Sequence, residues 1–130
     1  MSERFNKYFR RSEFLCRGFL VGICNCGCDT VDKLTFEYLM ASRIFFDKPL
    51  IITSACRCLI YNRHIGSDDS SQHLKFRAVD HYIVGVSAED LYKFYSSKFG
   101  TKYGLGLYND FVHIDTRSDG PSRWDDRTPN

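Results

Sequence analysis

The chain has 130 residues, of which 43% are hydrophobic, 15% aromatic and 26% charged, so we expect a globular fold rather than disorder. Its 18 basic and 16 acidic residues leave a formal net charge of +2, which excludes a strong electrostatic footprint for nucleic acid. We therefore expect one domain over residues 1–130 and no nucleic-acid partner. Residues 1–11 are predicted to form a charged N-terminal arm, and residues 118–130 an irregular tail.

The N-terminal region does not have the pattern of a signal peptide. Basic residues precede an apolar stretch at residues 14–24, but Arg17 interrupts this stretch and no small-residue cleavage site follows it. No apolar run is long enough to span a bilayer, so we expect no stable membrane insertion. The chain is expected to be made in the cytoplasm without a secretion signal of its own.

The first predicted helix covers residues 31–46. Apolar residues recur there at helical spacing, Asp29 or Thr30 precedes them as a candidate cap, and Pro49 ends the pattern. The β-branched run at residues 50–53 then predicts a short buried strand.

The second half of the chain alternates strands with one helix. A polar loop over residues 60–71 is followed by a strand at 78–84, and Ser87 caps a helix that runs to about residue 99. Glycines lead into the last two predicted strands, residues 103–107 and 111–115. These elements predict an α+β fold, in which a small antiparallel sheet carries helices packed on one side.

Six cysteines lie at positions 16, 24, 26, 28, 56 and 58. Their even number is compatible with disulfides, but a cytoplasmic chain of this size would keep its thiols reduced. The run Cys24-x-Cys26-x-Cys28 is also compatible with a metal site, although paired zinc ligands are usually separated by ~2–4 residues rather than one. We expect small buried or loop-lining thiols, with a second zinc site as the alternative.

Two histidines and one aspartate are the candidate metal ligands. His73 and Asp80 lie seven residues apart, His73 in the polar loop and Asp80 on the predicted strand, while His113 lies on the last strand. His81 falls on the opposite strand face from Asp80 and is left out. Two imidazoles and one carboxylate form a typical catalytic zinc shell with a fourth position for water, so we expect one Zn²⁺ per chain.

Three short motifs around these residues match the pattern of a known family. They are Ser54-x-x-Arg57, Ser71-x-His73-x4-Ala78-x-Asp80 and Asp110-x-x-His113-x-Asp115. In these motifs the chain resembles the zinc D-Ala-D-Ala carboxypeptidases and the phage L-Ala-D-Glu endopeptidases, which cut bacterial cell-wall peptides. The resemblance covers most of residues 12–117 and implies the fold shared with the hedgehog signalling domain.

One position departs from the family pattern. Phe76 stands where the family usually has glycine, a residue that often marks a backbone conformation or a close approach that phenylalanine cannot copy. The sequence alone therefore leaves the local path of the chain open at this point.

The resemblance also implies roles for residues around the metal. Asp110 takes the position of the catalytic acid, which would accept a proton from the metal-bound water. Arg57 would bind a substrate carboxylate, with an ordinary ion pair as the alternative. Ser71 would hydrogen-bond substrate or orient the site, and Asp115 would orient a ligand histidine unless it is an ordinary buried ion-pair partner.

These expectations describe a zinc peptidase that hydrolyses peptidoglycan stem peptides, in the manner of a phage endolysin with L-Ala-D-Glu endopeptidase activity. We expect a monomer that reaches the cell wall after phage lysis or as part of the virion. The alternatives are a D-Ala-D-Ala carboxypeptidase or dipeptidase on the same site, and a non-catalytic zinc-binding or wall-binding virion protein.

Overall fold

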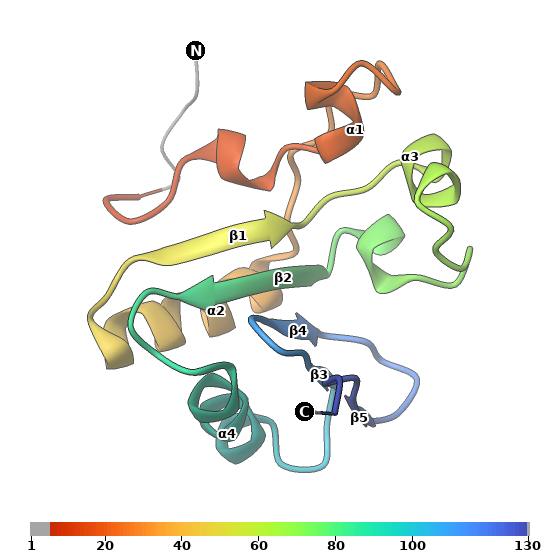
Figure 1. The fold of residues 1–130 in the computed structure, drawn as a ribbon. Helices are drawn as coiled ribbons and strands as arrows, with labels where there is room; N and C mark the ends of the chain where they lie inside the picture. The colour runs from red at the N-terminus through yellow and green to blue at the C-terminus, as the bar shows by residue number, and fades with distance from the viewer. Residues whose placement is uncertain (1–5, 130) are drawn as a thin grey trace.

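The structure, a computed structural model, describes residues 6–129, so the first five residues of the predicted arm and the last residue of the predicted tail lie outside the described residues. Its centre is a five-stranded sheet in the order β1-β2-β4-β3-β5 (Figure 1). The strands are β1 (Leu50–Ser54), β2 (Ala78–Ile83), β3 (Gly104–Leu107), β4 (Val112–Asp115) and β5 (Ser122–Asp125). The first four pair antiparallel, as predicted.

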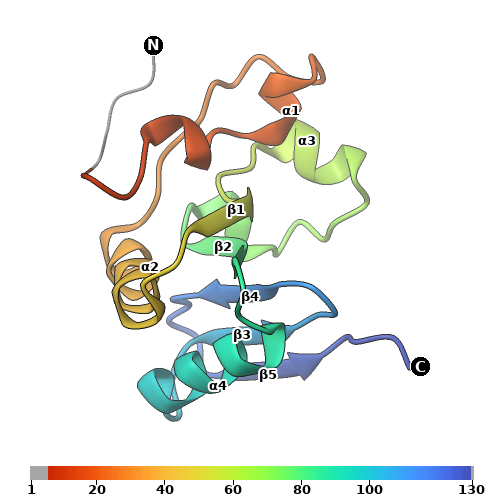
Figure 2. The ribbon, with the colours of Figure 1, turned by 60° about the vertical axis from the view of Figure 1, so that its left-hand side comes forward.

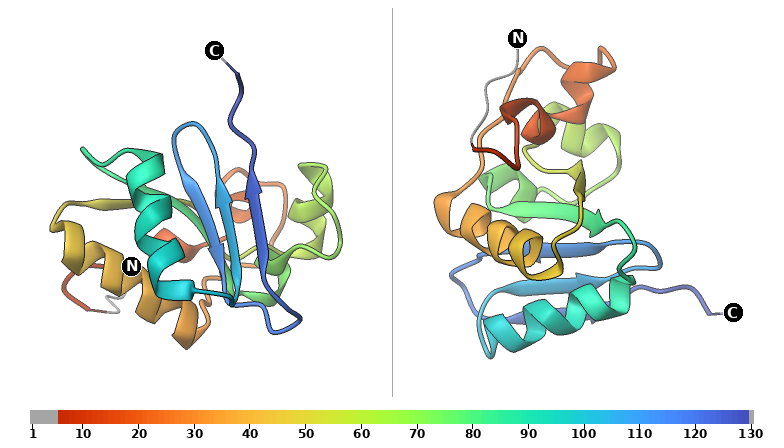
Figure 3. Two further views of the ribbon diagram at one scale, coloured as in Figure 1. Left: turned by 90° about the horizontal axis from the view of Figure 1, so that it is seen from below. Right: turned by 90° about the vertical axis from the view of Figure 1, so that its left-hand side faces the viewer.

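Helices α2 and α4 cover one face of the sheet (Figures 1 and 3), which confirms the predicted α+β layering. The helical elements are α1 (Arg17–Leu20), α2 (Lys33–Phe46), α3 (Leu59–His64), α4 (Ala88–Phe99) and the 3-10 turns η1 (Arg11–Phe14) and η2 (Gln72–Lys75). Within residues 6–129, none of the helices has both the length and the apolar character needed to cross a membrane. Helix α1 lies beside α3 (Figures 1 and 2), with Gly18 against the Tyr61 side chain.

The cap of α2 differs from the two predicted candidates. Asp32, rather than Asp29 or Thr30, is the N-cap, and its Oδ2 accepts hydrogen bonds from the amides of Leu34 at 3.1 Å and Thr35 at 3.3 Å. A carboxylate at this position satisfies two amides that have no partner within the helix. Helix α4 begins as predicted, with Ser87 as its N-cap.

Strand alternation divides the central strands into a core face and a second face. Val79 and Ile83 of β2 and Val112 and Ile114 of β4 are almost fully buried in the core with α2 and α4. Because successive side chains of a strand point to opposite faces, the residues between them project from the other side of the sheet. Asp80 is one of these residues, so the hydrophobic pattern itself decides where the polar site forms.

One polar network is buried between the sheet and the helices. The neutral ring of His81 faces the Val79 carbonyl with Nδ1 at 3.3 Å and accepts a hydrogen bond at Nε2 from the Tyr95 hydroxyl at 2.7 Å. The same hydroxyl is hydrogen-bonded to Ser42 Oγ at 2.7 Å. Burial lowers the pKa of His81 to about 4, so the ring stays uncharged at neutral pH. His81 is thus structural, in agreement with its exclusion from the metal site.

The tail does not remain irregular over its whole length. Residues 122–125 form β5, which pairs in parallel with β3 in the register Gly104↔Ser122 to Leu107↔Asp125. The sequence prediction of an irregular segment over residues 118–130 is therefore wrong for these four residues. The four residues, Ser-Arg-Trp-Asp, carry no alternation of polar and apolar residues that would indicate a strand, and they form one by pairing with β3.

The buried network makes a prediction about stability. Tyr95→Phe removes the hydroxyl that contacts His81 and Ser42 and leaves buried polar atoms without it, so it should lower the free energy of unfolding by about 1–3 kcal/mol. Urea denaturation followed by circular dichroism measures this change. Tyr82→Phe, on the exposed part of β2, is the matched control and should stay within about 0.5 kcal/mol of the wild type. Equal stabilities of the two variants would contradict the assigned network.

Candidate metal centre

Three side chains from separate segments meet on the face of the sheet opposite α2 and α4. Asp80 of β2 is the direct cross-strand partner of His113 on β4, and η2 brings His73 to the same point. Asp80 Oδ1 lies 2.8 Å from His113 Nδ1 and 3.2 Å from His73 Nε2. One ligand atom from each residue lies within 4.8 Å of the others, a group compact enough to surround a single cation. The predicted ligands are therefore brought together.

Each histidine is oriented by a hydrogen bond from its other ring nitrogen. His73 donates from Nδ1 to the Ala55 carbonyl at 2.8 Å, and His113 donates from Nε2 to Asp115 Oδ2 at 2.7 Å. These bonds leave Nε2 of His73 and Nδ1 of His113 directed at Asp80. Such outer partners fix the tautomer and ring orientation of metal-binding histidines, so the donor set fits a divalent metal such as zinc.

The carboxylate that orients His113 is itself firmly held. Asp115 is completely buried, and Arg117 donates to it from Nε at 2.7 Å and from a terminal nitrogen at 2.6 Å. Burial alone would raise the pKa of Asp115, but the hydrogen bonds from Arg117 and His113 outweigh it and lower the pKa well below the usual range. A Cβ atom at Gly104, the cross-strand neighbour of Asp115, would collide with this carboxylate. Glycine at position 104 is therefore what allows Asp115 to lie over β3.

The negative charge of Asp80 is balanced by the neighbouring histidines. Burial raises the pKa of this carboxyl, but the neighbouring His73 and His113 outweigh that effect and hold the pKa well below its usual range. Burial likewise lowers the pKa of His113, whereas its hydrogen bonds to Asp115 and Asp80 raise the pKa to about 9. The negative charge at this point thus draws in a positive partner, either a proton on His113 or a metal cation.

The turn that carries His73 keeps the path expected of a glycine at position 76. Ser71 caps η2 by accepting a hydrogen bond from the His73 amide at 3.3 Å, so its hydroxyl helps to orient the ligand. Phe76 ends the turn in the left-handed conformation, with φ 60° and ψ 23°. The local path that the sequence left open is thus a left-handed one, in which phenylalanine adopts a conformation typical of glycine. The side chain remains partly exposed, which leaves space for this conformation.

Arg57 lies next to the ligands and makes several protein contacts. A terminal nitrogen of its guanidinium lies 3.6 Å from Asp80 Oδ2, Nε donates to Ser54 Oγ at 3.0 Å, and another terminal nitrogen donates to Asn62 Oδ1 at 3.3 Å. These contacts include the ion pair weighed as the alternative for Arg57. The guanidinium has further N–H groups, and the residue also lines the pocket beside the metal group.

The ligands lie in an open pocket with a volume of about 460 Å³. Its lining includes residues of the β1–β2 connection, among them Ser71 and Lys75, and also Tyr108, Arg117 and Trp124. Its lining is mostly polar and charged, which suits a polar ligand more than an apolar one.

Comparison with known proteins agrees with this geometry. A family model described as Peptidase M15 matches residues 7–115, which include all three candidate ligands. The chain belongs to the Peptidase M15 family. This family consists of metallopeptidases, so membership accounts for a metal group of two histidines and one aspartate in a polar pocket. No curated protein and no solved structure matches the chain.

One predicted site residue of this M15 chain lies away from the pocket. Asp110 is exposed in the turn between β3 and β4, residues 108–111, where it lines a separate cavity with Thr53 and Tyr82. The rings of Tyr108 and Phe111 stack at 4.3 Å and close the turn. Because three residues of extended chain span about 10 Å, the turn separates Asp110 from the ligands. The structure therefore does not bring Asp110 to the metal group.

Tyr108, Arg117 and Trp124 belong to the pocket but were not among the predicted site residues. The Trp124 ring lies 5.0 Å from the His113 ring, and its Nε1 donates to the Tyr108 hydroxyl at 3.0 Å. The period-2 pattern that places His113 and Asp115 on one face extends to Arg117 and contained enough information to find it. No comparable pattern indicates Trp124, which reaches the site only because β5 pairs with β3.

The role of Asp115 in orienting His113 can be tested through metal affinity. Asp115→Asn should weaken zinc binding about 10–100-fold, because the ligand histidine loses its charged partner. Competition with a chromophoric zinc chelator measures the change. Asp125→Asn is a matched control, since Asp125 contacts Arg127 two residues later just as Asp115 contacts Arg117, but at the surface. Unchanged zinc affinity in Asp115→Asn would contradict the role given to this carboxylate.

Proposed function

We propose that the protein is a zinc peptidase that hydrolyses peptidoglycan stem peptides, with the L-Ala-D-Glu endopeptidase activity of a phage endolysin. The observation that carries the proposal is the His73–Asp80–His113 group, whose histidines are both turned toward Asp80 by partners outside the group. It occurs in a chain that belongs to the Peptidase M15 family.

The residues of the pocket would have different roles in hydrolysis. Zinc held by His73, Asp80 and His113 would lower the pKa of a bound water to roughly 7 and polarise the scissile carbonyl. Asp80 supplies the single negative charge among these ligands, so the site keeps a positive character where the oxyanion develops. Arg57 lies on the other side of Asp80 and adds a fixed positive charge to the same pocket.

The substrate class follows from the charges that line the pocket. Arg57, Lys75 and Arg117 bring cationic groups to it, against the acidic residues Asp68 and Asp119. Stem peptides carry free carboxylates along their length, and arginine is well suited to bind them in a bidentate manner. We propose that Arg57 binds the carboxylate next to the scissile bond, while Ser71 keeps the turn of the ligand histidine in place.

We propose Asp110 as the proton acceptor, on the basis of its position three residues before His113. Catalytic hydrogen bonds are often long or absent in a substrate-free enzyme and form only when substrate is bound. The turn that carries Asp110 is short and exposed, and the proposal requires it to approach the pocket with substrate present.

We propose that the protein acts as a monomer on the cell wall, after release during phage lysis or as a component of the virion. A balanced charge of +2 accords with the absence of a nucleic-acid partner in this proposal.

The activity is tested by incubating the protein with a synthetic L-Ala-D-Glu-containing stem pentapeptide and with purified peptidoglycan. Mass spectrometry should detect release of L-Ala together with a fragment that begins at D-Glu. A chelator should abolish the reaction, added zinc should restore it, and Asp80→Asn should be inactive because the site loses its charged ligand. Loss of terminal D-Ala would instead identify a carboxypeptidase, and zinc binding without cleavage would identify a wall-binding protein.

The role of Asp110 has its own test. Asp110→Asn should lower kcat about 10²–10⁴-fold while the zinc content stays unchanged, as expected for loss of a general base. Asn109→Asp, a substitution at the neighbouring turn residue, is the control and should retain activity. Full activity of Asp110→Asn would remove this residue from the mechanism and leave it as part of the turn.

A further inference from the structure

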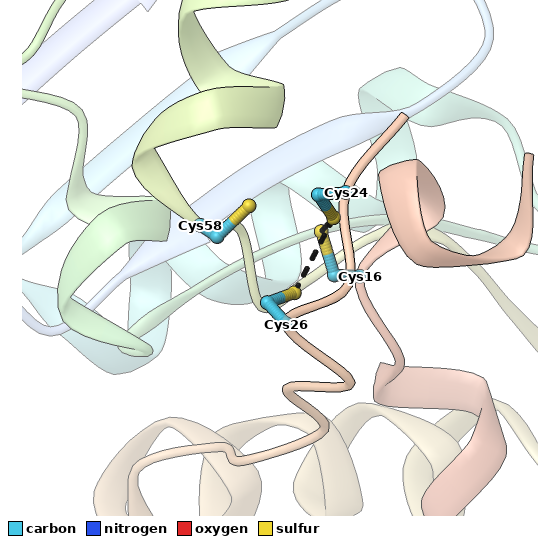
Figure 4. A group of neighbouring side chains, drawn as sticks. All are labelled: Cys16, Cys24, Cys26 and Cys58. Carbon is cyan, nitrogen blue, oxygen red and sulfur yellow. Dashed lines mark hydrogen bonds between the residues drawn. The ribbon is translucent and has the colours of Figure 1, made fainter. Parts of the chain in front are cut away.

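A second group of possible metal ligands lies away from the pocket. Four cysteines from two distant parts of the chain gather between α1 and α3: Cys16, Cys24, Cys26 and Cys58 (Figure 4). Their sulfur atoms all lie within 4.8 Å of one another. Cys24 Sγ is 3.5 Å from Cys26 Sγ and 3.9 Å from Cys16 Sγ. The side chains converge on one point, although Cys58 lies far along the chain from the other three, between β1 and α3.

We propose that these four cysteines bind a structural zinc ion. Four thiolates in a tetrahedron, each about 2.3 Å from the metal, have sulfurs about 3.8 Å apart, which is close to the separations observed. Four protein ligands leave no position for water, so this site would stabilise the fold and not take part in hydrolysis. The proposal does not depend on the peptidase function.

The remaining two cysteines explain why the sequence favoured another interpretation. Cys28 is bonded to Cys56 in a disulfide, with Cα atoms 6.1 Å apart, so the expectation that every thiol stays reduced does not hold for this pair. The run Cys24-x-Cys26-x-Cys28 was unsuitable for one ion because Cys28 points elsewhere. Cys16 and Cys58 complete the set of ligands, and no local spacing in the sequence indicates that they meet.

The arrangement favours a metal over two additional disulfides. In a pair of disulfides the four sulfurs would separate into two bonded couples, as Cys28 and Cys56 do. Cys24 instead lies at similar distances from Cys16 and Cys26, and all four cysteines are unbonded. Two of them, Cys16 and Cys24, are buried, whereas Cys58 is half-buried and Cys26 is exposed, so the site lies at the edge of the core and reaches the surface.

The proposed site would hold in place the loop that carries Arg57, one of the residues that line the pocket. The segment between the disulfide at Cys56 and the cluster at Cys58 contains only Arg57, which lines the pocket and contacts Asp80. The residue before the disulfide-bonded Cys56 is Ala55, whose carbonyl orients His73. A metal at the cysteine cluster would therefore tie this loop to the N-terminal segment that carries the other three cysteines.

Metal content in a variant without the first site is the decisive measurement. The double variant His73→Ala/His113→Ala, purified without oxygen, should retain about one zinc per chain by plasma mass spectrometry. Replacement by Co²⁺ should give the intense near-ultraviolet charge-transfer band of thiolate ligands. A protein that contains no metal and shows no such band would overturn the proposal.

Cysteine variants identify the ligands. In the same background, Cys26→Ser/Cys58→Ser should lose the metal and the charge-transfer band, while Cys28→Ser/Cys56→Ser should retain both. The wild-type protein can also be denatured in the presence of a chelator and without a reductant, and its thiols then titrated. This titration should count four thiols, the ones that the structure leaves free. This measurement does not require a variant to fold, and a count of zero would show two further disulfides and refute the metal site.

Discussion

The pairing of Asp80 with His113 across strands β2 and β4 is the contact on which the rest of the site depends. A slip of one strand by one residue would turn Asp80 or His113 into the core and bring Val79 or Ile114 to the opposite face of the sheet. Because the apolar residues on the opposite face are fully buried, such a shift is strongly opposed. The packing of the apolar residues on one face of the sheet thus fixes the positions of Asp80 and His113 on the other face.

The second requirement is that each histidine presents the correct nitrogen. A backbone carbonyl does this for His73, and a buried carboxylate does it for His113. Both partners come from segments that are themselves constrained: Ala55 lies just before the disulfide-bonded Cys56, and Asp115 is held by Arg117 over Gly104. The M15 site is therefore supported by two layers of contacts. In the outer layer a short motif indicates Asp115, whereas no spacing in the sequence indicates the Ala55 carbonyl.

Much of the fold and the ligand set could be predicted because both depend on local patterns. Period-2 alternation located β2 and β4, helical spacing located α2 and α4, and short motifs indicated His73, Asp80 and His113. Contacts that form only between distant segments were not accessible in this way. The pairing of β5 with β3, the position of Trp124 beside His113 and the meeting of Cys58 with Cys16 all arise from tertiary packing. Phe76 shows the reverse case, since the surrounding turn imposes a conformation that this residue type rarely adopts.

Strand β5 lies beyond residue 115, where the match to the family model ends, yet it contributes Trp124 to the pocket wall and closes the open edge of β3. The three candidate ligands thus lie within the family match, while the lining of the pocket is formed partly by residues outside it. A change in the sequence of this short strand would alter the lining of the pocket without replacing any of the three candidate ligands. A chain that ended before it would keep the ligands but expose an unpaired strand edge, which favours self-association.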